Sequence, residues 1–147
     1  MSRKALLLGS SLLLSATLLQ AQDVEISEDR DTAIDTSSFL GLSPALLTLI
    51  ENVTISAPTG PVITVNGPHS LSLAGTVQSL DSTTGIGIFV DTSTDILSDI
   101  QIDGDIVLNG PDGFDLDLTL ESTNTGILFD GPGSFTGDLT LSDSGSI

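Results

Sequence analysis

The side chains of this protein that could do chemistry are a single histidine, several serines and many aspartates. His69 is the only histidine among 147 residues. A serine nucleophile requires a histidine base that is oriented by a third group, and the residues around His69 do not nominate such a serine. Ser134 follows a proline and a glycine, so it lacks the glycine two positions earlier that a nucleophile elbow requires. We therefore predict no catalytic residue and expect His69 to lie exposed in a turn.

Metal and cofactor sites are not predicted either. One histidine and no cysteine do not supply the ligands of a typical zinc site. The spacing Gly110-x-x-Gly113-x-Asp115 matches part of the calcium-binding nonapeptide repeat, but Pro111 and Asp117 break the pattern. The aspartates near these corners are therefore expected to be solvated surface groups: Asp103, Asp105, Asp112, Asp115 and Asp117.

The charge balance argues against nucleic acids and anionic membranes as partners. The chain has 3 Lys and Arg against 20 Asp and Glu, a formal net charge of −17. Phosphate backbones are bound by clustered Lys and Arg. Only Arg30 remains once the basic residues of an N-terminal signal are set aside. We predict no nucleic-acid partner and a solvated, self-repelling surface.

Residues 1–21 have the three parts of a secretory signal peptide. Arg3 and Lys4 give a positive start, Ala5 to Leu19 form an uncharged apolar run, and Ala21 offers a small residue for cleavage. The apolar run is shorter than the about 20 residues that span a bilayer as a helix, which favours cleavage over a retained membrane anchor. We expect cleavage after Ala21 and export of the rest.

The rest of the chain predicts an aliphatic core of short strands. It has five Phe and no Tyr or Trp, so the core cannot be organised around large rings. From Asn52 onward, runs with period-two alternation are separated by corners rich in Gly, Pro and Asn. The predicted strands are Val53 to Ile55, Pro61 to Val65, Ser70 to Leu73, Thr76 to Leu80, Gly87 to Val90, Ile100 to Ile102, Asp105 to Leu108, Phe114 to Leu120, Gly126 to Phe129 and Phe135 to Leu141.

Two phrases recur among these strands. The first phrase consists of an apolar residue, any residue, a glycine, an acidic residue or threonine, and a second apolar residue. It is centred on Gly75, Gly104 and Gly137. The second runs from Gly87 to Asp91 and again from Gly126 to Asp130. Because the two phrases recur in a fixed order, they indicate equivalent positions on successive coils. An antiparallel sandwich does not predict such a recurrence. We predict an all-β fold, a right-handed parallel β-helix (solenoid) with coils of about 20 to 30 residues.

Residues 22–51 are expected to be an acidic lead-in with a short capping helix. Residues 22–42 have little periodic apolar content, which predicts an extended or loosely ordered segment. Ser43 and Pro44 are typical of a helix start, and the apolar residues between Leu46 and Ile50 could line one side of a helix. A strand is the competing interpretation. Residues 52–147 would then hold the repeats, which end in mid-pattern and are expected to be truncated.

Two groups of residues carry a family resemblance. They are Ile26-Ser-Glu-Asp-Arg30-Asp-Thr-Ala-Ile34-Asp-Thr-Ser37, Asn52-Val-Thr-Ile-Ser56 and Pro61-Val-Ile-Thr-Val65 at the start, and Gly133-Ser-Phe-Thr-Gly-Asp-Leu-Thr-Leu141 near the end. The first group resembles the start of a passenger domain of bacterial autotransporters, and the second is similar to the β-helical coils of those passengers. The resemblance covers nearly the whole chain and rests on loose repeats. It implies a signal peptide, a β-helical passenger and a C-terminal membrane barrel, and a place at the bacterial cell surface or outer membrane or outside the cell.

Three functions remain open. The preferred one is a non-enzymatic surface passenger that acts as a stalk or adhesin for a host-surface, cell-surface or polysaccharide ligand, with the outer-membrane barrel in cis. The alternative is a carbohydrate-active lyase or hydrolase whose catalytic residues lie beyond this segment, because Arg30 alone cannot hold a sugar along a groove. The third is an ice- or surface-binding solenoid, which Thr92 and Thr94 favour only locally because the pair does not recur at coil spacing. A glycosylation sequon, Asn52-Val-Thr54, would matter only in a eukaryotic secretory route.

Overall fold

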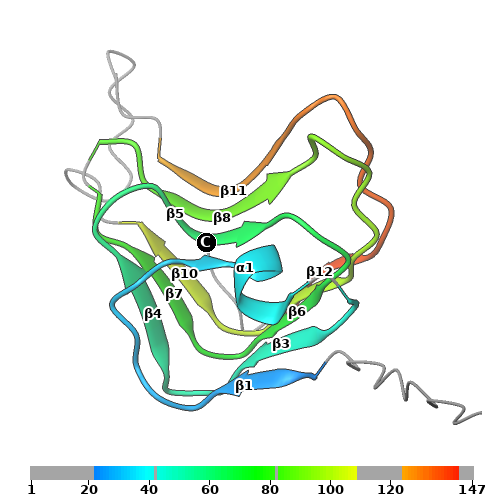
Figure 1. Ribbon diagram of the computed structural model, residues 1–147. Coiled ribbons are helices and arrows are strands. Elements are labelled where there is room, and N and C mark those ends of the chain that lie inside the picture. The colour runs from blue at the N-terminus through cyan, green and yellow to red at the C-terminus, as the bar shows by residue number, and fades with distance from the viewer. Residues whose placement is uncertain (1–21, 42, 82, 109–123, 143–147) are drawn as a thin grey trace, which may run out of the picture.

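The computed structural model describes residues 22–41, 43–81, 83–108 and 124–142. These residues form an all-β structure with one short helix, which confirms the predicted class (Figure 1). The elements in chain order are β1 (Val24–Ile26), β2 (Ile34–Asp35), α1 (Thr36–Leu40), β3 (Leu46–Leu49), β4 (Thr54–Ala57), β5 (Pro61–Val65), β6 (Ser70–Leu73), β7 (Thr76–Ser79), β8 (Ile86–Asp91), β9 (Ile100–Ile102), β10 (Asp105–Leu108), β11 (Thr125–Asp130) and β12 (Leu139–Leu141).

The strands form three parallel sheets. Sheet A has the order β1-β3-β6-β9-β12, sheet B the order β10-β7-β4, and sheet C the order β11-β8-β5-β2. Each named strand of the described residues pairs in parallel with its neighbours. Parallel neighbours need a long connection between them, and here that connection is the visit to the other two sheets. The antiparallel sandwich weighed against this arrangement is excluded.

The chain visits the three sheets in a repeating order. From β3 to β12 the strands belong to sheets A, B and C in turn, three times over, and end in sheet A. We call one visit of the chain to sheets A, B and C a pass. In the first pass Arg30 lies where a sheet B strand would lie, and it makes a single parallel bridge to Ile55. Figure 1 shows the sheets on three sides of a common interior, with α1 lying across it.

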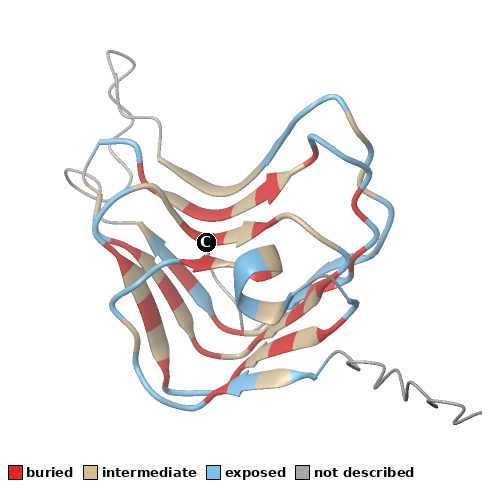
Figure 2. Ribbon diagram, viewed as in Figure 1, coloured by how far each residue is buried: buried red, intermediate tan, exposed pale blue. Residues whose placement is uncertain are grey.

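Aliphatic side chains from successive passes form columns in this interior. Ile34, Ile63, Ile88 and Ile127 are in register across sheet C. Sheet A aligns Leu47, Leu71, Ile100 and Leu139, and sheet B aligns Ile55, Val77 and Ile106. Because successive side chains of a strand point to opposite faces, the alternation in the sequence places these residues inside and their polar neighbours outside. Figure 2 shows buried and partly exposed residues alternating along the strands.

The structure corrects the expectation for residues 22–51. The segment that predicted a capping helix forms strand β3, because Leu47 and Leu49 alternate into the interior between β1 and β6. The competing strand interpretation is therefore right. The short helix lies earlier, at α1, inside the segment expected to be extended or loosely ordered. That segment also contributes β1 and β2 to the sheets.

The second repeated phrase occupies equivalent positions, as predicted. Ile127 pairs with Ile88, and Asp130 pairs with Asp91. The first phrase is equivalent only at Gly75 and Gly104, which precede the paired strands β7 and β10.

The third member of the first phrase is out of register with the other two. Gly137 precedes β12 of sheet A and lies against Ser98. The reason is the length of the last pass, in which Asp138 meets Asp99 across 39 residues, whereas Asp99 meets Ser70 across 29. The predicted strand at Phe135 to Leu141 shortens to β12, and the one at Phe114 to Leu120 lies outside the described residues.

Candidate functional site

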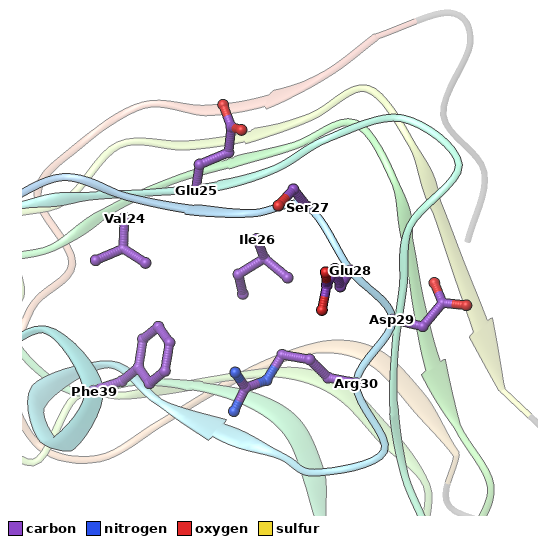
Figure 3. Close-up of a pocket in the computed structure, with 8 residues that line it drawn as sticks. All are labelled: Val24, Glu25, Ile26, Ser27, Glu28, Asp29, Arg30 and Phe39. Carbon is purple, nitrogen blue, oxygen red and sulfur yellow. The ribbon is translucent and has the colours of Figure 1, made fainter.

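One hollow among the described residues lies at the end of the molecule where the first pass begins. It has a volume of about 310 Å³ and is lined by Val24, Glu25, Ile26, Ser27, Glu28, Asp29, Arg30 and Phe39. In Figure 3 the side chains of Val24 and Ile26 point toward the space that Phe39 and Arg30 share, whereas Glu25 and Asp29 point away from it. The lining therefore combines an apolar floor, one cation and a carboxylate rim.

Arg30 is fixed in this hollow by its own backbone. Its amide donates to the Thr54 carbonyl at 2.9 Å and its carbonyl accepts from the Ser56 amide at 2.8 Å, so it adds one rung to sheet B. Its guanidinium lies 5.0 Å from the centre of the Phe39 ring, a distance at which a cation and an aromatic face attract each other. The buried Nε has no hydrogen-bond partner. The Arg30 side chain thus puts a charge at this end of the interior, at the position that Ile55 and Val77 occupy in the later passes.

Helix α1 brings Phe39 to this position. Asp35 caps its start by accepting from the Ser38 amide at 2.9 Å, and Gly41 ends it at φ 87°, a conformation that glycine adopts without strain. Desolvation raises the pKa of Asp35, but hydrogen bonds from the backbone and side chain of Ser38, from Ser37 and from Asn66 together hold it below its ordinary value.

Asn66 ties α1 to the end of β5. Its side-chain oxygen accepts from the Ser37 amide at 2.9 Å and from the Thr36 hydroxyl at 3.2 Å, and its side-chain nitrogen donates to Asp35 at 2.6 Å. Its backbone amide donates to the Thr36 hydroxyl at 3.2 Å. A helix of this length cannot form in isolation, so these contacts hold it in place.

His69 is buried, which corrects the prediction of an exposed turn histidine. Its side chain is 0% exposed, and its Nε2 lies 2.9 Å from the Gly41 carbonyl oxygen, to which it donates. Its Nδ1 is buried without a hydrogen-bond partner. The corner folds inward here because Gly67 leaves room for the imidazole, whose Cδ2 would lie 2.9 Å from a Cβ at that position. His69 therefore helps to anchor the C-terminal end of α1.

Ser134 takes part in a structural contact. Its amide and hydroxyl both donate to Asp95 at 2.9 Å, across 39 residues of sequence. The backbone hydrogen bond from Ser134, with the one from its hydroxyl, lowers the pKa of Asp95. The hydroxyl is thus committed to a carboxylate in the preceding pass.

Corner aspartates share this role of joining successive passes. Asp23 accepts from the Leu46 amide and Asp29 from the Thr54 amide, both at 2.8 Å. Asp99 accepts from the Asp138 amide at 3.1 Å. Each carboxylate satisfies an amide in the next pass, a strand start in the first two cases, that would otherwise face water. The sequence analysis did not predict these contacts, which the recurrence of Asp before strands could have indicated.

A second hollow, of about 350 Å³, lies at the corner between sheets A and B. It is lined by Glu51, Asn52, Ala74, Gly75, Thr76, Asp103, Gly104 and Asp105. The structure brings Asp103 and Asp105 together here, whereas Asp112, Asp115 and Asp117, with Gly110 and Gly113, lie outside the described residues. Within the described ranges, no group of three or more His, Cys, Asp or Glu side chains is placed to hold a metal ion.

Two further sequence features receive a structural setting. Asn52, the acceptor of the sequon, is exposed at φ 62°, in the left-handed region that asparagine tolerates. Thr92 is buried and Thr94 is exposed, so the two do not share one exposed face. The ice-binding alternative loses its local support.

Comparison of the chain with known proteins gives no match. No family model, no curated protein and no solved structure matches the chain. Among the described residues, none belongs to a helix with the length and apolar character to cross a membrane.

Proposed function

We propose that this chain is the exported N-terminal portion of a β-helical surface protein of the autotransporter type, with residues 1–21 as its signal peptide. In this proposal the three parallel sheets form a right-handed β-helix that serves as a stalk or adhesin and carries out no catalysis. The ligand would be a host-surface, cell-surface or polysaccharide structure, and an outer-membrane barrel would be joined in cis.

The observation that carries the proposal is the register of equivalent side chains. Ile34, Ile63, Ile88 and Ile127 occupy the same place in four successive passes. Each pass thus buries its apolar side chains against the next one, which is how solenoids are stabilised. Connections between parallel strands are right-handed in the great majority of proteins, which supports that hand for the winding.

Two other features fit a rod displayed outside the cell. The chain has no cysteine, so folding after secretion would need no disulfide formation. The outward column of sheet A is polar, with Glu25, Thr48, Ser72, Gln101 and Thr140 in register. Such a surface is solvated and leaves the loops free to carry contacts.

The enzyme alternative gains no support from the hollows. The only cation retained after signal cleavage stacks on Phe39, and the Ser134 hydroxyl is bound to Asp95. Their contacts are structural, so neither group is poised for reaction.

Surface display is the decisive test. Intact cells that produce the full gene product would be treated with proteinase K, and a segment between residues 24 and 108 would be followed with an antibody. We expect the antibody to detect no such segment after treatment of intact cells, while a periplasmic marker protein stays uncleaved. Protection until the outer membrane is opened would contradict the proposal. Binding of the purified protein to immobilised glycans or host-cell surfaces would then separate an adhesin from a stalk.

A further inference from the structure

Asn66 and Gly67 form a dipeptide that is chemically labile in a flexible chain. In an Asn-Gly pair the glycine amide nitrogen attacks the asparagine side-chain carbonyl carbon, because no Cβ on the glycine hinders its approach. A carbon–nitrogen bond forms and closes a succinimide ring, and the side-chain nitrogen leaves as ammonia with the amide proton. Water then opens the ring at either carbonyl, which leaves aspartate or isoaspartate in place of the asparagine.

The fold requires both residues of this pair. Asn66 holds the start of α1, because its side-chain oxygen accepts from the Ser37 amide at 2.9 Å and its side-chain nitrogen donates to Asp35 at 2.6 Å. Gly67 leaves room for the buried imidazole of His69, whose Cδ2 would lie 2.9 Å from a Cβ at position 67. A replacement at either position would therefore cost a contact that holds α1.

The same contacts restrain the Asn66 side chain in the folded protein. Its oxygen also accepts from the Thr36 hydroxyl at 3.2 Å, and its backbone amide donates to that hydroxyl at 3.2 Å. Ring closure moves the side-chain carbonyl carbon onto the Gly67 nitrogen, and the leaving nitrogen must give up its hydrogen bond to Asp35. The reaction therefore has to wait until α1 moves away. A helix as short as α1 is held by its tertiary contacts, so it can open locally while the sheets stay folded.

We propose that Asn66 is a modification site that α1 protects, and that its conversion to aspartate or isoaspartate releases α1 permanently. The aspartate product puts a carboxylate oxygen where the side-chain nitrogen donated to Asp35 at 2.6 Å, so two negative oxygens face each other and repel. Isoaspartate also adds a methylene group to the backbone just after β5, which displaces His69 from the Gly41 carbonyl. The proposal rests on these contacts and is independent of the export route.

Release of α1 would change the end of the molecule where the first pass begins. Figure 1 shows α1 lying across the interior at this end. Because α1 carries Phe39, its release also removes the ring from the Arg30 guanidinium, which lies 5.0 Å from the ring centre. A transient opening of the cover thus becomes irreversible in each molecule in which Asn66 reacts.

Peptide mapping of the purified full chain by mass spectrometry tests the protection. The chain would be incubated in mildly alkaline buffer with and without urea. We expect conversion at Asn66 to be about tenfold or more slower in the folded chain, because the reaction follows the population of the open form. In urea, Asn109-Gly110 gives the reference rate of an Asn-Gly pair. Asn52 is exposed but precedes a valine, so it should convert far more slowly than Asn66 in urea.

A variant that loosens α1 tests the link to the helix. His69→Ala changes neither residue of the pair, and it should speed conversion at Asn66 in the folded chain about tenfold or more. In urea this variant and the unchanged chain should convert at the same rate. Thr59→Ala, at an exposed corner, is the matched control and should leave the folded rate unchanged. If His69→Ala does not fold, Asp35→Ala takes its place, because it removes the α1 cap at a partly exposed position.

Asn66→Asp mimics the product and tests the release of α1. Hydrogen exchange would be followed by NMR at the Ser38 amide, which donates to Asp35, and at the Gly41 amide, which donates to the Ser37 carbonyl. Both amides should exchange about tenfold or more faster than in the unchanged chain. The matched control is Asn124→Asp. It adds the same charge but can still accept from the Gly85 amide at 2.7 Å, so α1 should keep its protection.

Three results would overturn the proposal. Equal rates at Asn66 with and without urea would show that the contacts to α1 give no protection. A lack of conversion in urea would show that the pair is not reactive. Unchanged exchange of the α1 amides in Asn66→Asp would show that the helix stays in place after the modification.

Discussion

Gly104 lies so close to the carbonyl oxygen of Gly75 that a side chain on Gly104 would collide with it. The two glycines occupy the same corner in successive passes, each just before its sheet B strand. Gly75 in turn lies against the backbone of the pass below, with the Ile50 carbonyl 2.6 Å from a Cβ at position 75. The repeated glycine is thus required by backbone-to-backbone contact between passes.

Gly104→Ala should therefore destabilise the protein by about 1–3 kcal/mol, since rigid backbone on the other side cannot move aside. The control is Thr59→Ala, at an exposed corner. It removes only exposed side-chain atoms, so the change should stay within about 0.5 kcal/mol. Urea unfolding followed by circular dichroism measures both. Equal stability of the two variants would show that the corner can relax.

Much of the fold could be predicted from the sequence because the alternation is strict. The bounds of β5, β6, β9 and β10 agree with the predicted strands, and the parallel pairing of β8 with β11 follows from the repeated Gly-to-Asp phrase. The helix prediction for the segment that forms β3 was wrong, because its consecutive leucines fit a helical period as well as the alternation of a strand. Only the neighbours β1 and β6 decide between the two.

The candidate site was less accessible to sequence reasoning. His69 was expected to lie exposed in a turn because the sequence around it suggested no partner, but it is buried with its Nε2 against the Gly41 carbonyl oxygen. The stacking of Arg30 on Phe39 joins residues from different elements and has no local signature. The hydrogen bonds of Asp23, Asp29 and Asp99 to amides one pass away were not predicted either. These contacts depend on how successive passes align. The passes differ in length, and that difference is not visible in any single repeat.

Removing the His69 side chain should loosen α1. His69→Ala would leave the Gly41 carbonyl without its donor and open a void in a buried site, for a loss of about 2 kcal/mol or more in the free energy of unfolding. His69→Gln can still donate to that carbonyl and should lose less. Thr59→Ala, at an exposed corner, is the control and should change little. The measurement is urea unfolding, and an unaffected His69→Ala variant would contradict the anchoring role.

Arg30 and Phe39 should be energetically coupled. A double-mutant cycle with Arg30→Ala, Phe39→Ala and the double variant isolates their interaction, which we expect at about 0.5–1 kcal/mol for a partly exposed cation and ring. Thr32→Ala serves as the control, because the Thr32 hydroxyl lies at the limit of hydrogen bonding, 3.5 Å from Arg30 Nη2. A coupling energy of zero would mean that the two side chains are neighbours without mutual stabilisation.

Asp81 should make the stability of the fold depend on acidity. Its carboxylate accepts from the amides of Thr83 and Thr84, at 2.9 and 3.1 Å, and from both of their hydroxyls. The backbone hydrogen bond from Thr83, followed by that from Thr84, lowers the pKa of Asp81 from 3.8 to about 2. A carboxylate whose pKa is lower in the folded state stabilises the fold above its unfolded pKa. That contribution is lost as the pH falls from about 4 toward 2.

The Asp81→Asn variant separates the charge from the hydrogen bonds, because its side-chain oxygen can still accept from both amides. Stability would be measured by urea unfolding at a series of pH values. We expect the variant to lose less stability than the unchanged protein between pH 4 and pH 2, the window set by the two pKa values. Asp31→Asn, an exposed aspartate at another corner, controls for the change in net charge. Parallel pH profiles for the unchanged protein and Asp81→Asn would contradict the assignment, because the Asp81 turn would then bind the charged and neutral forms equally.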